Sequence, residues 1–141
     1  MELTTFGALL QFALELEGTA VQFYEEAAKV AQQAEVQEDF QTSAGEGKRY
    51  RKKLERMRRE NVNEMLLESF QGLEGKDYRM ELGLSPDMGD GELRALALQL
   101  EGALERFYRD AAGRLSLPEV ARGLARLAEV HAQRKAGLGE I

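Results

Sequence analysis

Two stretches of the chain, ALELEGTAVQFYEEAA at 13–28 and ALQLEGALERFYRDAA at 97–112, decide the fold. They align without a gap at an offset of 84 residues and share 9 identities in 16 positions, which indicates an internal repeat. In each copy a glutamate, Glu17 or Glu101, stands seven residues before a tyrosine, Tyr24 or Tyr108. Seven residues make about two helical turns, so each pair lies on one face. The repeat therefore predicts two equivalent helices with matching inner faces.

Apolar stripes extend both repeats into complete helices. Alternate steps of three and four residues trace one stripe over 10–31 and another over 97–115, the spacing of a buried helix face. Thr4 or Thr5 is the expected cap of the first helix. Asp90, which follows a Gly-rich stretch, is the expected N-cap of the other.

Two more helices follow the repeat copies. One begins near Val36 or Phe40 and runs into the mid-60s, although Ser43-x-x-Glu46 offers a capping box as another start. The last helix opens at the capping box Ser116-x-x-Glu119, with a proline in its first turn. The expected inner faces hold Phe40, Ala44, Gly47, Tyr50, Leu54 and Met57 in the former and Leu124, Leu127, Ala128, His131 and Leu138 in the latter.

The connections and the composition predict an all-α, single-domain chain over 1–141. Only two of the 141 residues are proline, while Ala, Leu, Glu, Arg and Gln are abundant, which favours helix. Short turns follow the first and third helices, and a Gly-rich crossover covers about 62–90. This pattern predicts a four-helix bundle made of two helical hairpins joined by a long crossover.

Composition also limits the chemistry and the compartment. The chain has no Cys, which excludes disulfides, thiolate metal sites and cysteine catalysis. The segment 1–18 carries no basic residue, and its longest uncharged run, 3–14, is too short to span a bilayer. We therefore expect a cytoplasmic protein without a membrane segment.

Leu14–Lys29, LELEGTAVQFYEEAAK, together with the later KRYRKKLERM and the second FYxxAA copy at 107–112, resembles the ferritin-like domain of the rubrerythrin family. The resemblance covers most of the chain. It implies a bundle of ferritin-like topology, a homodimer, and two iron ions. In that family one Glu from each of two helices and a Glu-x-x-His pair from each of the other two hold the iron.

Carried over position by position, this ligand set is incomplete. Glu17, Glu101 and His131 match the family's ligands and are the candidate metal ligands. Gly47 and Tyr50 stand where the second helix carries its Glu-x-x-His pair, and Ala128 stands where the fourth helix carries its Glu. Both bridging carboxylates are therefore missing. The acids next to these positions, Glu46 and Glu129, are rotated by about 100° from the inner face.

Two hypotheses follow. The first is a rubrerythrin-related protein with an incomplete di-iron site that is non-catalytic or weakly metal-binding, with iron or another divalent metal at low occupancy or absent. The second is an iron-dependent oxidoreductase or iron-handling protein whose rearranged site adds Glu46, Tyr50 or Glu129 to the three matching ligands. Because the chain has no four-cysteine rubredoxin-type centre, a redox-active version needs an external electron donor. Without a metal, the buried Glu17 and Glu101 need protons or partners such as Tyr24, Tyr50 or Tyr108.

Three other features carry expectations. Gly47, and the repeat-related Gly18 and Gly102, predict close approach of neighbouring helices. The segment 48–59 holds eight basic residues and one acid, but it lacks interleaved aromatics, and the net charge of -6 argues against nucleic acid as a partner. An apolar cluster, Met65, Leu66, Leu67 and Phe70, is expected at the bundle end or in a dimer surface.

Overall fold

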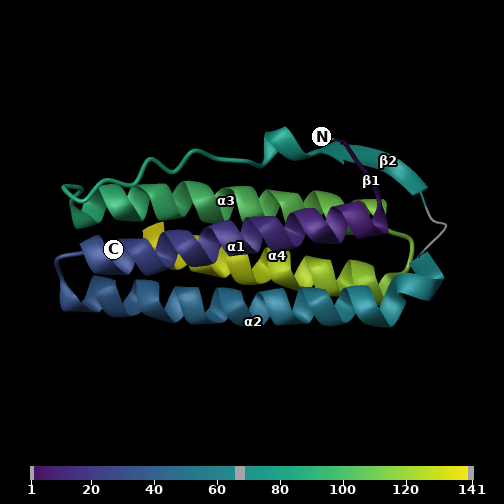
Figure 1. Cartoon of the computed structure of the whole chain (residues 1–141), viewed down its shortest axis with the longest axis horizontal. Helices are drawn as coiled ribbons and strands as arrows, with labels where there is room; N and C mark the ends of the chain where they lie inside the picture. Colours follow the sequence, from purple (N-terminus) through teal and green to yellow (C-terminus); the bar gives the residue numbers. More distant parts are fainter. Residues whose placement is uncertain (1, 66–68, 140–141) are drawn as a thin grey trace.

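The computed structural model describes residues 2–65 and 69–139. It has four long helices, α1 Phe6–Val30, α2 Ala34–Met65, α3 Asp90–Arg114 and α4 Pro118–Gly139. Short turns join α1 to α2 and α3 to α4, and the four helices lie lengthwise beside one another (Figure 1). The prediction of an all-α bundle of two hairpins with a long crossover is confirmed. Among the described residues no helix is both long and apolar enough to cross a membrane.

The helix starts follow the capping signals in part. Thr5 caps α1, since its hydroxyl accepts a hydrogen bond from the Ala8 N–H at 3.2 Å. α2 begins at Ala34, two residues before the predicted start at Val36. The alternative start at the Ser43-x-x-Glu46 box is wrong, because that box lies within the helix. Gly89 is the N-cap of α3, so the prediction of Asp90 as the N-cap is also wrong.

Asp90 has a different task. Its carboxylate accepts hydrogen bonds from the backbone N–H groups of Gln32 at 2.8 Å and Gln33 at 3.0 Å. Both amides belong to the turn just before α2, where amides lack partners within a helix. The start of the second hairpin is therefore tied to the turn of the first.

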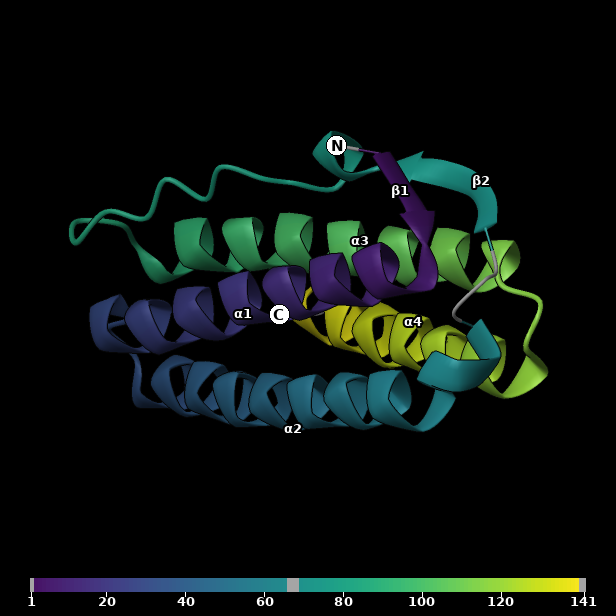
Figure 2. The same ribbon diagram turned by 45° about the vertical axis from the view of Figure 1, so that its right-hand side comes forward.

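The crossover contains a short antiparallel sheet that the sequence analysis did not predict. Strand β1, Glu2–Thr5, pairs with β2, Ser69–Glu74, with Leu3 opposite Leu73. Both leucines are buried, so the ribbon covers one end of the core. After β2 a 3-10 turn, η1 Gly75–Asp77, leads into a strand-free segment that returns along α3 (Figures 1 and 2). Because α2 continues to Met65, the crossover begins later than the predicted residue 62.

Side chains anchor the crossover to the bundle. Tyr78 is buried, its hydroxyl donates to Asp110 Oδ2 at 2.6 Å, and its ring meets the Phe107 ring edge-on at 5.3 Å. Arg79 lies over the ring of Phe12, with 5.0 Å between its Cζ and the ring centroid. The crossover is therefore a packed part of the domain.

The predicted inner faces of the helices form the core. All members of the α1 and α3 stripes are buried, and so are most of those expected on α2 and α4. The side chains of the apolar cluster at Met65, Leu66, Leu67 and Phe70 lie outside the described residues. Its expected place at a bundle end or dimer surface stays a prediction.

Candidate functional site

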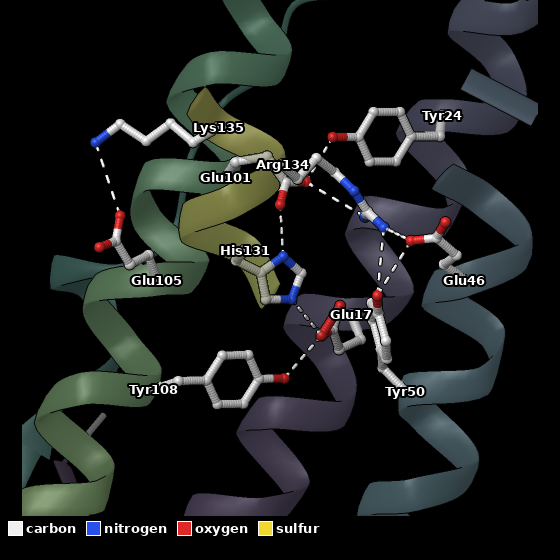
Figure 3. A network of polar contacts seen from close by, with 10 residues as sticks. All are labelled: Glu17, Tyr24, Glu46, Tyr50, Glu101, Glu105, Tyr108, His131, Arg134 and Lys135. Atoms are coloured by element: carbon white, nitrogen blue, oxygen red, sulfur yellow. Dashed lines mark hydrogen bonds and ion pairs between the residues drawn. The ribbon is translucent and has the colours of Figure 1, made fainter. Parts of the chain in front are cut away.

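The three candidate ligands meet in the middle of the bundle. Glu17 of α1 and Glu101 of α3 are fully buried, and His131 of α4 is 1% exposed. Its Nδ1 lies 2.5 Å from Glu101 Oε1, and its Nε2 lies 3.0 Å from Glu17 Oε2 (Figure 3). One imidazole thus connects both repeat copies and uses both ring nitrogens to do so.

Each tyrosine of the repeat donates a hydrogen bond to the glutamate of the other copy. Tyr24 of α1 donates to Glu101 Oε2 at 2.5 Å, while Tyr108 of α3 donates to Glu17 Oε2 at 2.8 Å. The expectation that tyrosines are partners of the buried acids is confirmed for Tyr24 and Tyr108. Burial, and then the charge of the acceptor, raises the pKa of each phenol well above its usual value. Both phenols therefore stay protonated and act as donors.

Two rings hold the imidazole in place. Tyr108 stacks on His131 with 5.6 Å between ring centroids and an interplanar angle of 5°. Tyr50 of α2 meets it edge-on, also at 5.6 Å, at 74°. The orientation of the His131 ring is thus fixed by packing as well as by its two hydrogen bonds.

Arg134 is the site residue that sequence reasoning missed. Its side chain is 12% exposed, and its guanidinium pairs with Glu46 of α2 and lies 3.8 Å from Glu101 Oε2. The Tyr50 hydroxyl lies 3.4 Å from its Nη2 and itself donates to Glu46 Oε2 at 3.1 Å. Its position in the sequence could have indicated it, because Arg134 follows His131 by about one helical turn and so lies on the same face.

Two cations offset most of the negative charge of the cluster. Burial alone lowers the pKa of His131, but hydrogen bonds and charges from Glu101 and Glu17 outweigh it and raise the pKa to about 9. Burial likewise opposes the charge of Arg134, and the negative charge of Glu101 raises its pKa nonetheless. At neutral pH two cations, an imidazolium and a guanidinium, therefore face the three carboxylates of Glu17, Glu46 and Glu101.

A family model described as "Ferritin-like domain" matches residues 7–140. The chain belongs to the ferritin-like domain family. Comparison with curated proteins and with solved structures found no match.

The described residues do not present the ligand set of the di-iron centre that the rubrerythrin resemblance implies. Ligands that share one ion lie about 3 Å apart or more, since each is about 2.1 Å from the metal, whereas His131 Nδ1 and Glu101 Oε1 are 2.5 Å apart. A protonated imidazole has no free lone pair for a metal. Within the described ranges, no group of three or more His, Cys, Asp or Glu is arranged to hold an ion. Arg134 also holds a positive charge within the cluster.

One polar atom of the cluster, Glu17 Oε1, lacks a partner. Glu17 Oε1 is buried and has no hydrogen-bond partner, whereas Oε2 of the same carboxylate has two. A buried, unpartnered carboxylate oxygen is costly. Glu17 Oε1 is therefore the place in the cluster with spare capacity for a ligand or a water.

Apolar packing surrounds two positions at which the rubrerythrin resemblance implies further ligands, Gly47 and Ala128. A Cβ on Gly47 would lie 2.7 Å from Val21 Cγ2 of α1, so the predicted close approach is confirmed there. Ala128 is fully buried and Glu129 is exposed.

The prediction of close helix approach is wrong around Gly18 and Gly102. Only the side-chain ends of Arg51 and Lys135, 3.8 Å away, lie near the place of a Cβ.

We expect Gly47→Ala to destabilise the ferritin-like domain by about 1 kcal/mol. Helix propensity favours alanine by about 1 kcal/mol, but overpacking against the stiff Val21 side chain costs about 1–3 kcal/mol. Gly45→Ala is the matched control on the same helix, because nothing lies within 4 Å of its Cβ position, and it should stabilise. Urea unfolding of both variants measures the difference. Equal gains in stability would show that Val21 yields freely.

Proposed function

We propose that the chain is a rubrerythrin-related ferritin-like protein in which the imidazolium of His131 and the guanidinium of Arg134 replace the metal ions. In this proposal it acts as a non-catalytic helical-bundle module. The observation that carries it is the engagement of both His131 ring nitrogens by carboxylates, at 2.5 and 3.0 Å. An imidazole held in this way is a cation that neutralises acids rather than a ligand for a metal.

The surroundings of His131 support the same proposal. Glu101 accepts from Tyr24 as well as from the imidazole and has Arg134 nearby. A metal ion entering here would have to displace a proton from His131 and meet the charge of Arg134. Both changes oppose binding, because like charges repel strongly in a poorly solvated interior.

The unpartnered Glu17 Oε1 favours a second candidate, a weak single-ion site or an iron-dependent activity built on Glu17, Glu101 and His131. Such an activity would need an external electron donor. For either candidate we propose a cytoplasmic protein that pairs as a homodimer.

Metal analysis separates the two candidates. Protein purified without chelator is expected to contain far less than one ion per chain, and ferrous titration under air is expected to give no transient iron-oxo absorbance. A chelator should leave its unfolding midpoint unchanged, because the resident cations are side chains. Near-stoichiometric metal in the natural protein that disappears in His131→Ala would refute the proposal and establish the second candidate. The same metal content in both proteins would place the ion elsewhere.

A further inference from the structure

A basic groove lies between α1 and α2, on the outside of the bundle. Its volume is about 400 Å³. Its lining comes from both helices and includes Gln11, Gly18, Arg51, Glu55, Arg58 and Arg59. The groove is separate from the buried cluster and plays no part in the proposed function.

The positive charges of the groove are only partly balanced. Arg58 donates to the neutral side chain of Gln11 at 3.2 Å, and neither Arg51 nor Arg59 forms an ion pair with any described residue. The groove also contains Glu15, but Arg79 of the crossover pairs with it at 3.3 Å. Three guanidinium groups therefore face one other carboxylate, that of Glu55, which leaves a surplus of about two positive charges.

The internal repeat supplies a comparison within the same molecule. A second groove lies at Gly102, which is the counterpart of Gly18 in the repeat. Lys135 follows Arg51 by the same offset of 84 residues, and it lies near Gly102 as Arg51 lies near Gly18. There Glu105 pairs with Lys135 at 3.8 Å and with Arg109 at 2.8 Å. The second groove also holds Arg106, which donates to the Asp77 carbonyl oxygen at 2.8 Å. All three of its cations therefore have an acceptor among the described residues, and Glu105 pairs with two of them.

The first groove has no acid at the position equivalent to Glu105. The position equivalent to Glu105 is Val21, a buried residue packed against the Gly47 position. Arg51 instead extends over the bare backbone of Gly18, with its Nη1 3.8 Å from where a Cβ would lie. The guanidinium is therefore held at the groove and forms no ion pair with a residue of the described ranges.

We propose that this groove binds the phosphoryl dianion of a small phosphate compound. The charge of such a group, about -2 above its second pKa of about 6, matches the surplus in the groove. Planar guanidinium groups bind phosphate oxygens in pairs of hydrogen bonds, and Gln11 adds an amide at the same wall. Arg51 and Arg59 are the principal ligands, because neither has to give up an ion pair with a described residue.

Titration with inorganic phosphate and with pyrophosphate tests the proposal. Backbone amide shifts in NMR spectra, recorded at about pH 8 and constant ionic strength, should report one site whose shifts centre on 11–18 and 51–59. Arg51→Gln and Arg59→Gln should each weaken binding about ten-fold, the loss expected for one charge-assisted contact. Lys135→Gln is the matched control, since its cation already has an acid partner, and it should leave the affinity unchanged. Helical circular dichroism confirms that each variant is folded.

Three results would overturn the assignment. Equal weakening by Arg51→Gln and Lys135→Gln would show a general charge effect instead of a site. Malonate binding as tightly as phosphate would show that the groove accepts any dianion. Binding only to duplex DNA, with a steep fall in salt, would make the basic face of α2 a polyanion surface. None of these results depends on the metal content, so this proposal and the proposed function succeed or fail separately.

Discussion

Replacing His131 by leucine is expected to lower the free energy of unfolding by about 3–5 kcal/mol, the usual cost of removing one partner from a buried ion pair. Glu17 and Glu101 are both fully buried, and each accepts a hydrogen bond from an imidazole nitrogen. Without His131 their remaining donors are Tyr108 and Tyr24, and Arg134 alone supplies positive charge to the cluster. Urea unfolding followed by circular dichroism measures the loss.

A neutral cluster is the control for this prediction. Combining Glu17→Gln and Glu101→Gln with His131→Leu removes the two buried charges that lose their imidazolium partner in the single variant. The triple variant should therefore regain much of the lost stability. The crossed tyrosine hydroxyls still find an amide oxygen to donate to. If the triple variant is as unstable as His131→Leu, then lost packing around the ring, and not unbalanced charge, explains the effect.

Stability is expected to fall by about 3 kcal/mol as pH rises from the ordinary imidazole pKa to that of folded His131, since each pKa unit is worth about 1.4 kcal/mol. The pKa of His131 rises from 6.5 to about 9 on folding, so the native state binds its proton more tightly than the unfolded chain does. The contribution is complete below about 6.5 and is lost as pH rises through about 9.

Urea unfolding at several pH values across this window measures the loss, and His131→Leu shows which group is responsible. In that variant the slope between the two pKa values should largely disappear. A slope of the same size in both proteins would assign the titration to another group.

The helices were predictable because their signals are local. The 84-residue repeat, the apolar stripes and Thr5 indicate α1 and α3 directly, and the proline-containing box marks where α4 begins. The β1–β2 pair was not predictable from such signals. Each strand is short, and Leu3 meets a partner 70 positions later, so no periodicity within either segment indicates the pairing. Asp90 illustrates a related limit, since a residue suited to capping its own helix binds a distant turn instead.

The site residues also divide into those with a local sequence signal and those whose role depends on distant contacts. The resemblance and the repeat indicated Glu17, Glu101, His131 and their tyrosine donors, because each lies on a face that the helical period defines. Arg134 was missed although it shares that face, since a long basic side chain near a helix end is usually solvated. Its role depends on Glu46, which projects from the edge of α2 toward it (Figure 3). The pairing of Arg134 with a residue of another helix is visible only after the helices are assembled.

The crossed hydrogen bonds of the repeat bear on how the two halves of the chain depend on each other. Tyr24 and Glu17 belong to one half, and Tyr108 and Glu101 to the other, yet each acid takes its phenol from the opposite half. The single histidine lies in the second half and serves both acids. Two copies of the first half would therefore leave both acids without an imidazole, and two copies of the second would hold one imidazole too many. The cluster as the structure shows it therefore needs one copy of each half.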